Sequence, residues 1–168
     1  MRCRPAAALV CLLAAQALAQ AVSPDVDWRE SEAPPPPVPR LDTLIPIEVP
    51  GATLRYGIDP ASVSLGNDGI VRYVVVATSS SGAMNANYEG IRCSTADFRV
   101  YARFNPDGGW SPGTDAEWRP LHEGRPFRHS LTVARNGACM GRSANRSLAQ
   151  ILRDLRSPVD RRFNNPGT

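Results

Sequence analysis

Lysine is absent from this chain of 168 residues, and all 19 of its basic side chains are arginine. Arginine keeps its charge at any pH and favours planar, two-pronged contacts with anionic groups. The formal net charge is only +3, which is too small for the overall basic footprint of a nucleic-acid-binding protein. We therefore expect no nucleic-acid partner.

Beyond its first twenty residues, the chain has no apolar run long enough for a membrane helix. Those residues combine two arginines, the apolar stretch "AAALVCLLAA" and the small-x-small site "ALA". This order is typical of a secretory signal peptide over residues 1–19. We expect cleavage after Ala19, or alternatively after Ala21. The expected product is a periplasmic protein that does not insert into the membrane once the signal is removed.

Cysteine is scarce, and two of the four, Cys3 and Cys11, lie in the expected signal peptide. Val10 precedes Cys11, whereas a lipoprotein signal requires a small residue there, so the protein is not expected to be a lipoprotein. Cys93 and Cys139 remain as an even pair in an oxidising compartment, which predicts a disulfide bond. That bridge would close a loop of about 47 residues, and the chain-entropy model gives it about 4 kcal/mol.

Two alternatives for the cysteine pair involve chemistry rather than structure. Histidine is even scarcer, and His122 and His129 could join the cysteines in a zinc site. Structural zinc sites usually pair ligands two to four residues apart, whereas here both histidines lie between two distant cysteines. A nucleophilic cysteine is the other alternative, but no neighbouring residue indicates a lowered thiol pKa. We expect neither a metal nor a cofactor.

Familiar catalytic motifs are missing. Residues 79–82, "SSSG", lack the G-x-S-x-G pattern around a serine nucleophile. An enzyme acting on an envelope polymer would need two well-placed carboxylates, or a histidine with a nucleophile. The nearest carboxylates are Glu89 and Asp97, and Glu89 is expected to share a strand face with Ile91 as a paired structural acid. We assign no catalytic residue and expect a non-enzymatic protein, with such an enzyme as the alternative.

Residues 20–50 are rich in acids and contain four consecutive prolines. Such a stretch favours an extended polyproline conformation and cannot form a helix. It is predicted to be a disordered linker, and Trp28 favours the alternative of a docking segment for a proline-binding partner. A domain is predicted over residues 51–157, followed by a disordered tail over residues 158–168.

The periodicity of the domain predicts an α+β fold. Alternating or continuous apolar residues predict strands around 63–65, 70–79, 87–93 and 98–104, with the second of these central and covered on both faces. Residues 126–136 fit either a helix or a strand, and we predict a helix. An apolar stripe with a capping box at its start predicts a second helix before Pro158. We expect a small, mostly antiparallel sheet of four to five strands with about two helices in the C-terminal third.

The two strands joined by "STAD" suggest a candidate ligand surface. If they pair, strict alternation places five polar or charged side chains on one face; we call this set the arginine–tyrosine face, and it consists of Tyr88, Arg92, Arg99, Tyr101 and Arg103. Four apolar side chains are expected on the opposite face, namely Phe98, Val100, Ala102 and Phe104. The face is either an ordinary solvated surface with cross-strand packing or a shallow site for an anionic or sugar-like ligand.

The run "YVVVATSSSGAMNANYEGIRCSTADFRVYARF", followed by a tryptophan pair and a late cysteine before an amphipathic helix, resembles the cryptic neisserial protein (CNP-like) family. The resemblance covers about residues 58–156, and "YEGIRC" with "FRVYA" is its most specific part. It implies a small exported proteobacterial protein with one periplasmic domain. The family has no established activity, so no functional residue is carried over. We expect a binding or accessory protein whose partner is an anionic envelope component or an envelope protein.

Overall fold

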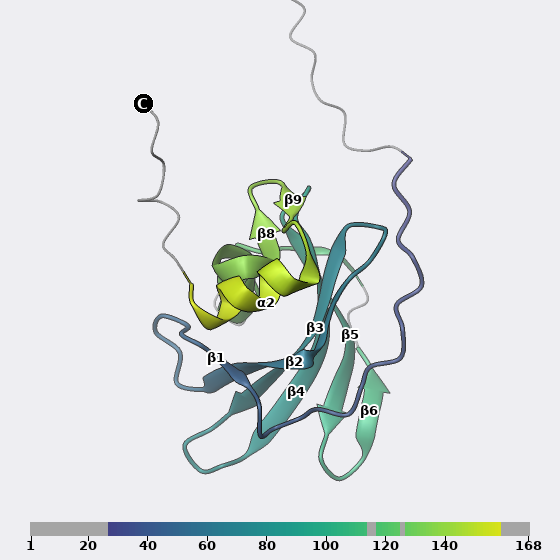
Figure 1. Ribbon diagram of the computed structural model, residues 1–168. Helices are drawn as coiled ribbons and strands as arrows, with labels where there is room; N and C mark the ends of the chain where they lie inside the picture. The colour runs from purple at the N-terminus through teal and green to yellow at the C-terminus, as the bar shows by residue number, and fades with distance from the viewer. Residues whose placement is uncertain (1–26, 114–116, 125–126, 159–168) are drawn as a thin grey trace, which may run out of the picture.

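The strands follow one another along the chain in one antiparallel sheet (Figure 1). The computed structural model describes residues 27–113, 117–124 and 127–158, so the expected signal peptide and most of the predicted tail lie outside the described residues. The sheet has the order β1-β2-β3-β4-β5-β6, and β7 pairs with β5. The bounds are β1 Ile45–Ile47, β2 Arg55–Leu65, β3 Ile70–Thr78, β4 Met84–Arg92, β5 Asp97–Asn105, β6 Gly109–Pro112 and β7 Arg119–Pro120.

Within the described residues this sheet has seven strands, so the expectation of four to five was too low. The additional strands, β1, β6 and β7, are two to four residues long and each contains a proline. Proline is tolerated in edge strands because its missing N–H need not face a neighbour. Strands this short show no period-two pattern, so only tertiary pairing identifies them.

The two predicted helices are present, which confirms the α+β class. They are α1 (Arg128–Val133), which continues into the π-helical turn η2 (Ala134–Ala138), and α2 (Leu148–Arg156). The helix predicted over residues 126–136 is thus confirmed from residue 128 onward. Ser147 caps α2, and its hydroxyl accepts a hydrogen bond from the Gln150 N–H at 3.2 Å. In the described part of the chain, no helix has the length and apolar character needed to cross a membrane.

The sheet has two buried faces. The inner face, named here for its contact with the helices, packs against α1, η2 and α2; its core includes Ile58, Tyr73, Ile91, Phe98, Val133, Ile151 and Leu155. The outer face carries a second cluster made of Val74, Val76, Ala86, Tyr88 and Ala102. Strand β3 contributes to both clusters, as expected for a central strand.

A β-bulge interrupts the pairing of β4 with β5. Tyr88 lies opposite Ala102, while Glu89 lies opposite Val100, so Tyr101 is the extra residue on β5. A bulge shifts every later side chain of its strand by one position, because successive side chains alternate between faces.

Because of the bulge, the side chains of β5 after Tyr101 lie on the opposite faces of the sheet from those predicted. Ala102 and Phe104 join the outer cluster instead of the inner core. Arg103 pairs with Asn87, whose side chain points to the inner face, so Arg103 leaves the arginine–tyrosine face and is exposed elsewhere. Strict alternation was therefore the wrong rule for the second half of this strand.

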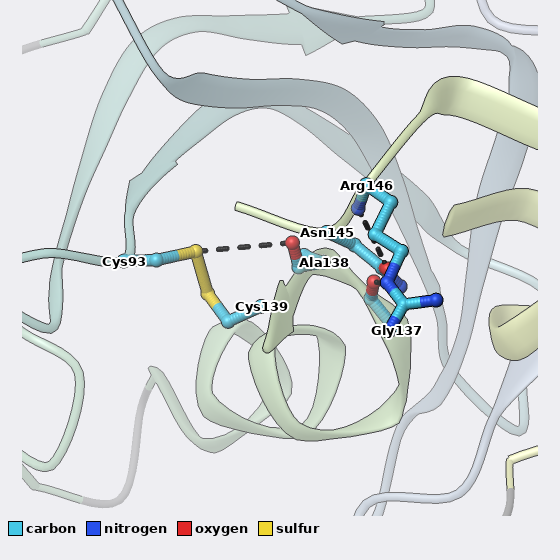
Figure 2. Close-up of a disulfide and its surroundings, with 6 residues drawn as sticks. All are labelled: Cys93, Gly137, Ala138, Cys139, Asn145 and Arg146. Atoms are coloured by element: carbon cyan, nitrogen blue, oxygen red, sulfur yellow. Dashed lines mark hydrogen bonds between the residues drawn. A yellow bond between two sulfur atoms is a disulfide. The ribbon is translucent and has the colours of Figure 1, made fainter. Parts of the chain in front are cut away.

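The Cys93–Cys139 disulfide is present, as predicted (Figure 2). The two Cα atoms are 5.7 Å apart, a normal separation for a bridged pair. Cys93 directly follows β4, and Cys139 directly follows η2 and begins the short hairpin of β8 (Cys139–Met140) and β9 (Ser143–Ala144). The bond joins the helical layer to the sheet. It also consumes the thiols that the zinc and nucleophile alternatives required.

Asn145 fixes the chain between η2 and α2 beside this bridge (Figure 2). Its side chain is 1% exposed, and its Nδ2 donates to the Gly137 carbonyl and to Asp154 Oδ2, both at 2.8 Å. Its backbone N–H donates to the Ala138 carbonyl at 2.9 Å. The disulfide and Asn145 together set how η2 sits on the sheet.

Candidate functional site

The outer face is covered by residues 27–44, which we call the N-terminal segment. Figure 1 shows the purple segment descending beside the β2–β3 hairpin, passing β6 and then crossing towards β1. Trp28 Nε1 donates to the Asp68 carbonyl at 2.9 Å, and the Arg40 N–H donates to Asp59 Oδ2 at 3.0 Å. The structure thus places residues 27–50 against the sheet, whereas residues 20–50 were predicted to be a disordered linker; residues 20–26 lie outside the described residues.

The physical reason for this difference is tertiary. Four prolines prevent helix formation and the acids add little apolar surface, so the segment cannot fold alone. It is ordered because the sheet supplies partners for its polar groups. The predicted domain start at residue 51 is also too late, since β1 begins at Ile45.

Glu30 is the central contact of the N-terminal segment. Its Oε2 accepts from Arg99 Nη1 at 2.7 Å and from Trp118 Nε1 at 3.2 Å. Its Oε1 accepts from the Tyr101 hydroxyl at 2.7 Å, and Arg72 Nη2 lies 3.7 Å from the same oxygen. The Glu30 side chain is 18% exposed. The outer face therefore contains a receptor for a carboxylate group, and the chain's own Glu30 occupies it.

Gly90 allows Tyr101 to reach this carboxylate. A Cβ atom at Gly90 would lie 2.7 Å from the Tyr101 hydroxyl oxygen, so any larger residue would displace the ring. Burial and the neighbouring Glu30 raise the pKa of Tyr101 above its ordinary value. Tyr101 therefore stays protonated and acts as a hydrogen-bond donor.

Trp28 is a second anchor of the segment and contacts one cationic and one aromatic side chain. The Arg92 guanidinium carbon lies 3.5 Å from the centroid of the Trp28 ring. Trp118 contacts the same ring edge-on, with centroids 6.1 Å apart. Cation–π contacts of this kind contribute about 0.5–2 kcal/mol, depending on how far water is excluded.

Arg72 and Asp68 provide fixed charges beneath the segment. Arg72 Nη2 donates to Asp68 Oδ2 at 2.7 Å and to the Ser31 carbonyl at 3.1 Å. The Ser31 N–H donates to the same carboxylate at 3.0 Å. Burial would raise the pKa of Asp68, but Arg72 and two backbone N–H groups outweigh it and lower that pKa. Burial would likewise lower the pKa of Arg72, and Asp68 raises it overall.

Four of the five residues predicted for the arginine–tyrosine face do lie together. Arg92, Arg99 and Tyr101 contact the N-terminal segment, and Tyr88 is buried beneath Tyr101 with ring centroids 5.4 Å apart. Arg103 lies elsewhere, because the bulge at Tyr101 places its side chain on the other face of the sheet. The sequence reasoning also left out three members of the site, namely Glu30, Arg72 and Trp118. An available signal was Arg72 itself, since a charge inside the apolar central strand "IVRYVVV" requires an anionic partner.

A separate polar cluster lies on the inner face around Glu89, whose side chain is fully buried. Its carboxylate accepts hydrogen bonds from Tyr73 Oη, Ser130 Oγ and His129 Nε2 at 2.9 Å, and from Asn87 Nδ2 at 3.1 Å. Burial alone would raise the pKa of Glu89, but His129 and the other donors outweigh it and lower the pKa. Glu89 is thus a paired, ionised acid on the Ile91 face, as the sequence indicated.

The geometry of this cluster favours a structural role. Ser130 Oγ donates to Glu89 Oε2 at 2.9 Å, so its hydroxyl is one of the donors that hold the buried carboxylate in place. Tyr56 stacks on the His129 ring at 5.0 Å, and both side chains line a cavity of about 410 Å³ under residues 49–54. Asp97, the other carboxylate considered, starts β5 opposite Arg92. Among the described residues no group of three or more potential ligands is arranged to hold a metal ion.

Limited proteolysis tests whether the N-terminal segment is held in solution. We expect trypsin to cleave slowly after Arg29, because Glu30 and Trp28 hold that stretch against the sheet. Replacing Glu30→Gln removes charge-assisted hydrogen bonds worth about 1.5–3 kcal/mol each and should accelerate this cleavage at least about tenfold. Glu32→Gln, at an exposed acid two positions away, is the matched control and should change nothing. Equal cleavage rates in all three proteins would show that the segment does not dock.

Most of the chain matches a known protein family. The model of the CNP1-like family matches residues 23–156, a range that includes the N-terminal segment, the sheet and both helices. This confirms the resemblance noted in the sequence. Neither the curated proteins nor the solved structures contain a match to the chain.

Proposed function

The chain belongs to the CNP1-like family, and on this premise we propose that it is an exported, non-enzymatic binding or accessory protein of the periplasm. The Cys93–Cys139 disulfide supports export, because such bonds persist in oxidising compartments. Membership of the family supplies no activity, so the ligand is argued from the outer face.

The observation that carries the proposal is the set of donors around Glu30. An arginine and a tyrosine of β5 and a tryptophan just before β7 converge on one carboxylate, with a second arginine from β3 behind them. Charge-assisted hydrogen bonds of this kind are the strong ones, and they select carboxylates and phosphates. We propose that an anionic group of an envelope component takes the position of Glu30.

Exchange of one anion for another is physically plausible at this site. Arg72 keeps Asp68 as its partner when Glu30 leaves. The donors of Arg99, Tyr101 and Trp118 lose a charged acceptor, and hydrogen bonds to a charged group contribute about 1.5–3 kcal/mol each. An incoming anion restores those hydrogen bonds, whereas simple opening of the segment does not.

The alternative is an enzyme acting on an envelope polymer, with the cluster of Glu89, His129 and Ser130 beside the cavity as its centre. The observation in its favour is that His129 lines this cavity. Hydrolysis of peptidoglycan by the purified protein, lost in His129→Gln at unchanged melting temperature, would favour this alternative over the binding protein.

A binding measurement with paired variants tests the proposal. The probes are soluble peptidoglycan fragments, which carry carboxylates, and lipopolysaccharide, which carries phosphates. Arg99→Gln should weaken binding at least about tenfold, since it removes a charge-assisted contact. Glu30→Gln should strengthen binding, because it removes the internal competitor. Both melting temperatures should stay within about 4 °C of wild type, because these contacts hold the N-terminal segment and not the two packed cores of the domain.

Arg103→Gln is the matched control for this measurement. It removes the same charge from the same strand, but from a position outside the arginine–tyrosine face. Equal losses in the Arg99 and Arg103 variants would mean that only net charge matters. Wild-type protein without affinity for either probe would contradict the proposal.

A further inference from the structure

The N-terminal segment resembles a bound peptide more than an element of the fold. Over residues 28–44 it forms no strand and no helix. Few backbone groups join it to the sheet, among them those of Ser31, Pro37 and Arg40. A polyproline stretch needs no partner for its remaining backbone groups, since water solvates them. The segment can therefore leave without breaking a strand ladder.

The outer face carries a cluster of aromatic rings beside Pro37, which we call the aromatic cluster. Trp110 packs against Phe104 with centroids 5.2 Å apart and against Tyr88 at 6.5 Å, and Tyr88 contacts Tyr101. Trp110 Nε1 donates to the Pro37 carbonyl at 3.1 Å. Aromatic grooves with a hydrogen bond to the peptide backbone are the usual means of holding proline-rich segments, whose conformation is already formed before binding.

The aromatic cluster and the carboxylate receptor lie on the same face of the sheet and contact two different parts of one segment. Glu30 enters the cluster of Arg99, Tyr101 and Trp118, while Pro37, further along the segment, meets Trp110. A ligand that satisfies both subsites must carry an acid and must place a backbone carbonyl beside Trp110. A proline-rich segment does this at low entropic cost, because its extended conformation is formed before binding. A small anion would satisfy only the first subsite.

We propose that the outer face is a receptor for an acidic, proline-rich polypeptide segment of a partner protein, and that residues 28–40 occupy it as an internal competitor. This inference rests on the proposed function, because the same carboxylate receptor holds both kinds of ligand. A tethered segment acts at an effective concentration in the millimolar range, so it blocks weak ligands until it is displaced. A partner segment binds by replacing it contact for contact.

The test uses the full chain and a fluorescent synthetic peptide of residues 27–41. In the double variant Trp28→Ala/Glu30→Gln the internal segment is weakened, so the peptide should bind at least about tenfold more tightly than to wild type. A peptide with glycine in place of Pro34–Pro37 keeps every charge and should bind at least tenfold more weakly. If the variant fails to fold, excess peptide with citrulline in place of its two arginines, which trypsin does not cleave, should instead accelerate tryptic cleavage of wild type after Arg29.

The outcomes separate this inference from the function on which it rests. No binding of the peptide and no acceleration of cleavage would overturn the inference, while Arg99-dependent binding of anionic envelope probes would leave the proposed function intact. Equal binding of the proline and glycine peptides would also overturn it, since charge alone would then explain recognition. If the wild-type protein instead forms a dimer as its concentration rises, the ligand of the outer face would be the N-terminal segment of a second copy.

Discussion

Replacing Glu89→Ala is expected to lower the free energy of unfolding by about 3–5 kcal/mol, the usual cost of removing one partner from a buried ionic cluster. The carboxylate is fully buried and accepts hydrogen bonds from Tyr73, Asn87, His129 and Ser130. Alanine leaves those donors without their acceptor in the inner core. Chemical denaturation at pH 7 measures the loss.

The matched control is Glu48→Ala, which removes an exposed acid just after β1. Surface substitutions of this kind change stability by about 0.5 kcal/mol or less. Similar losses in the two variants would contradict the assignment of Glu89 as the acid that holds the inner core together.

The pH dependence of stability provides a second readout of Glu89. Its pKa is lowered in the folded protein from an ordinary value of 4.5, so folding favours the ionised form. The resulting stabilisation is fully present above about pH 4.5 and is lost as pH falls through the lower folded pKa. Asp68 has a shift in the same direction. The Glu89→Ala protein should therefore lose less stability than wild type on acidification. The same dependence of unfolding free energy on pH in both proteins would contradict this.

Replacing both Cys93 and Cys139 by serine is expected to cost about 4 kcal/mol of unfolding free energy, from a closed loop of about 47 residues. The bond is the covalent link between the sheet and the turn after η2. Net stabilities of small domains are about 5–15 kcal/mol, so the change is large. Denaturation of the oxidised protein and of the variant measures it.

Reduced wild-type protein is the matched control for the cysteine variant. It should unfold at nearly the same denaturant concentration as the variant, because both lack the cross-link and they differ only by a sulfur or an oxygen atom at two positions. Reactive thiols at Cys93 and Cys139 in unfolded, unreduced protein would show that the bond does not form.

Much of the inner half of the molecule could be predicted from local patterns. The run "IVRYVVVATS" predicted a central strand buried on both faces, and the stripe of α2 with its Ser147 cap predicted the last helix. The pair of Cys93 and Cys139 followed from counting cysteines. These features depend on residues near one another in sequence or on a unique pairing, so few arrangements compete with them.

The candidate site depended on information that no local pattern contains. The bulge at Tyr101 is set by how β4 and β5 fit together, and it alone removes Arg103 from the arginine–tyrosine face. Glu89 could be placed on the correct face, but its partners His129 and Ser130 lie on α1, about 40 positions later in the chain. Such long-range polar contacts are favourable only once the core has excluded water.

The sequence by itself determined the α+β class, the central strand, the disulfide partners and most of the residues that form the arginine–tyrosine face, because periodicity and composition act locally. Only the tertiary structure decided what that face binds within the chain. The N-terminal segment has the composition of a disordered linker, and it is ordered by partners supplied from β3, β5 and β6. A carboxylate and a row of prolines gain a defined position only when a folded surface offers them donors and aromatic rings.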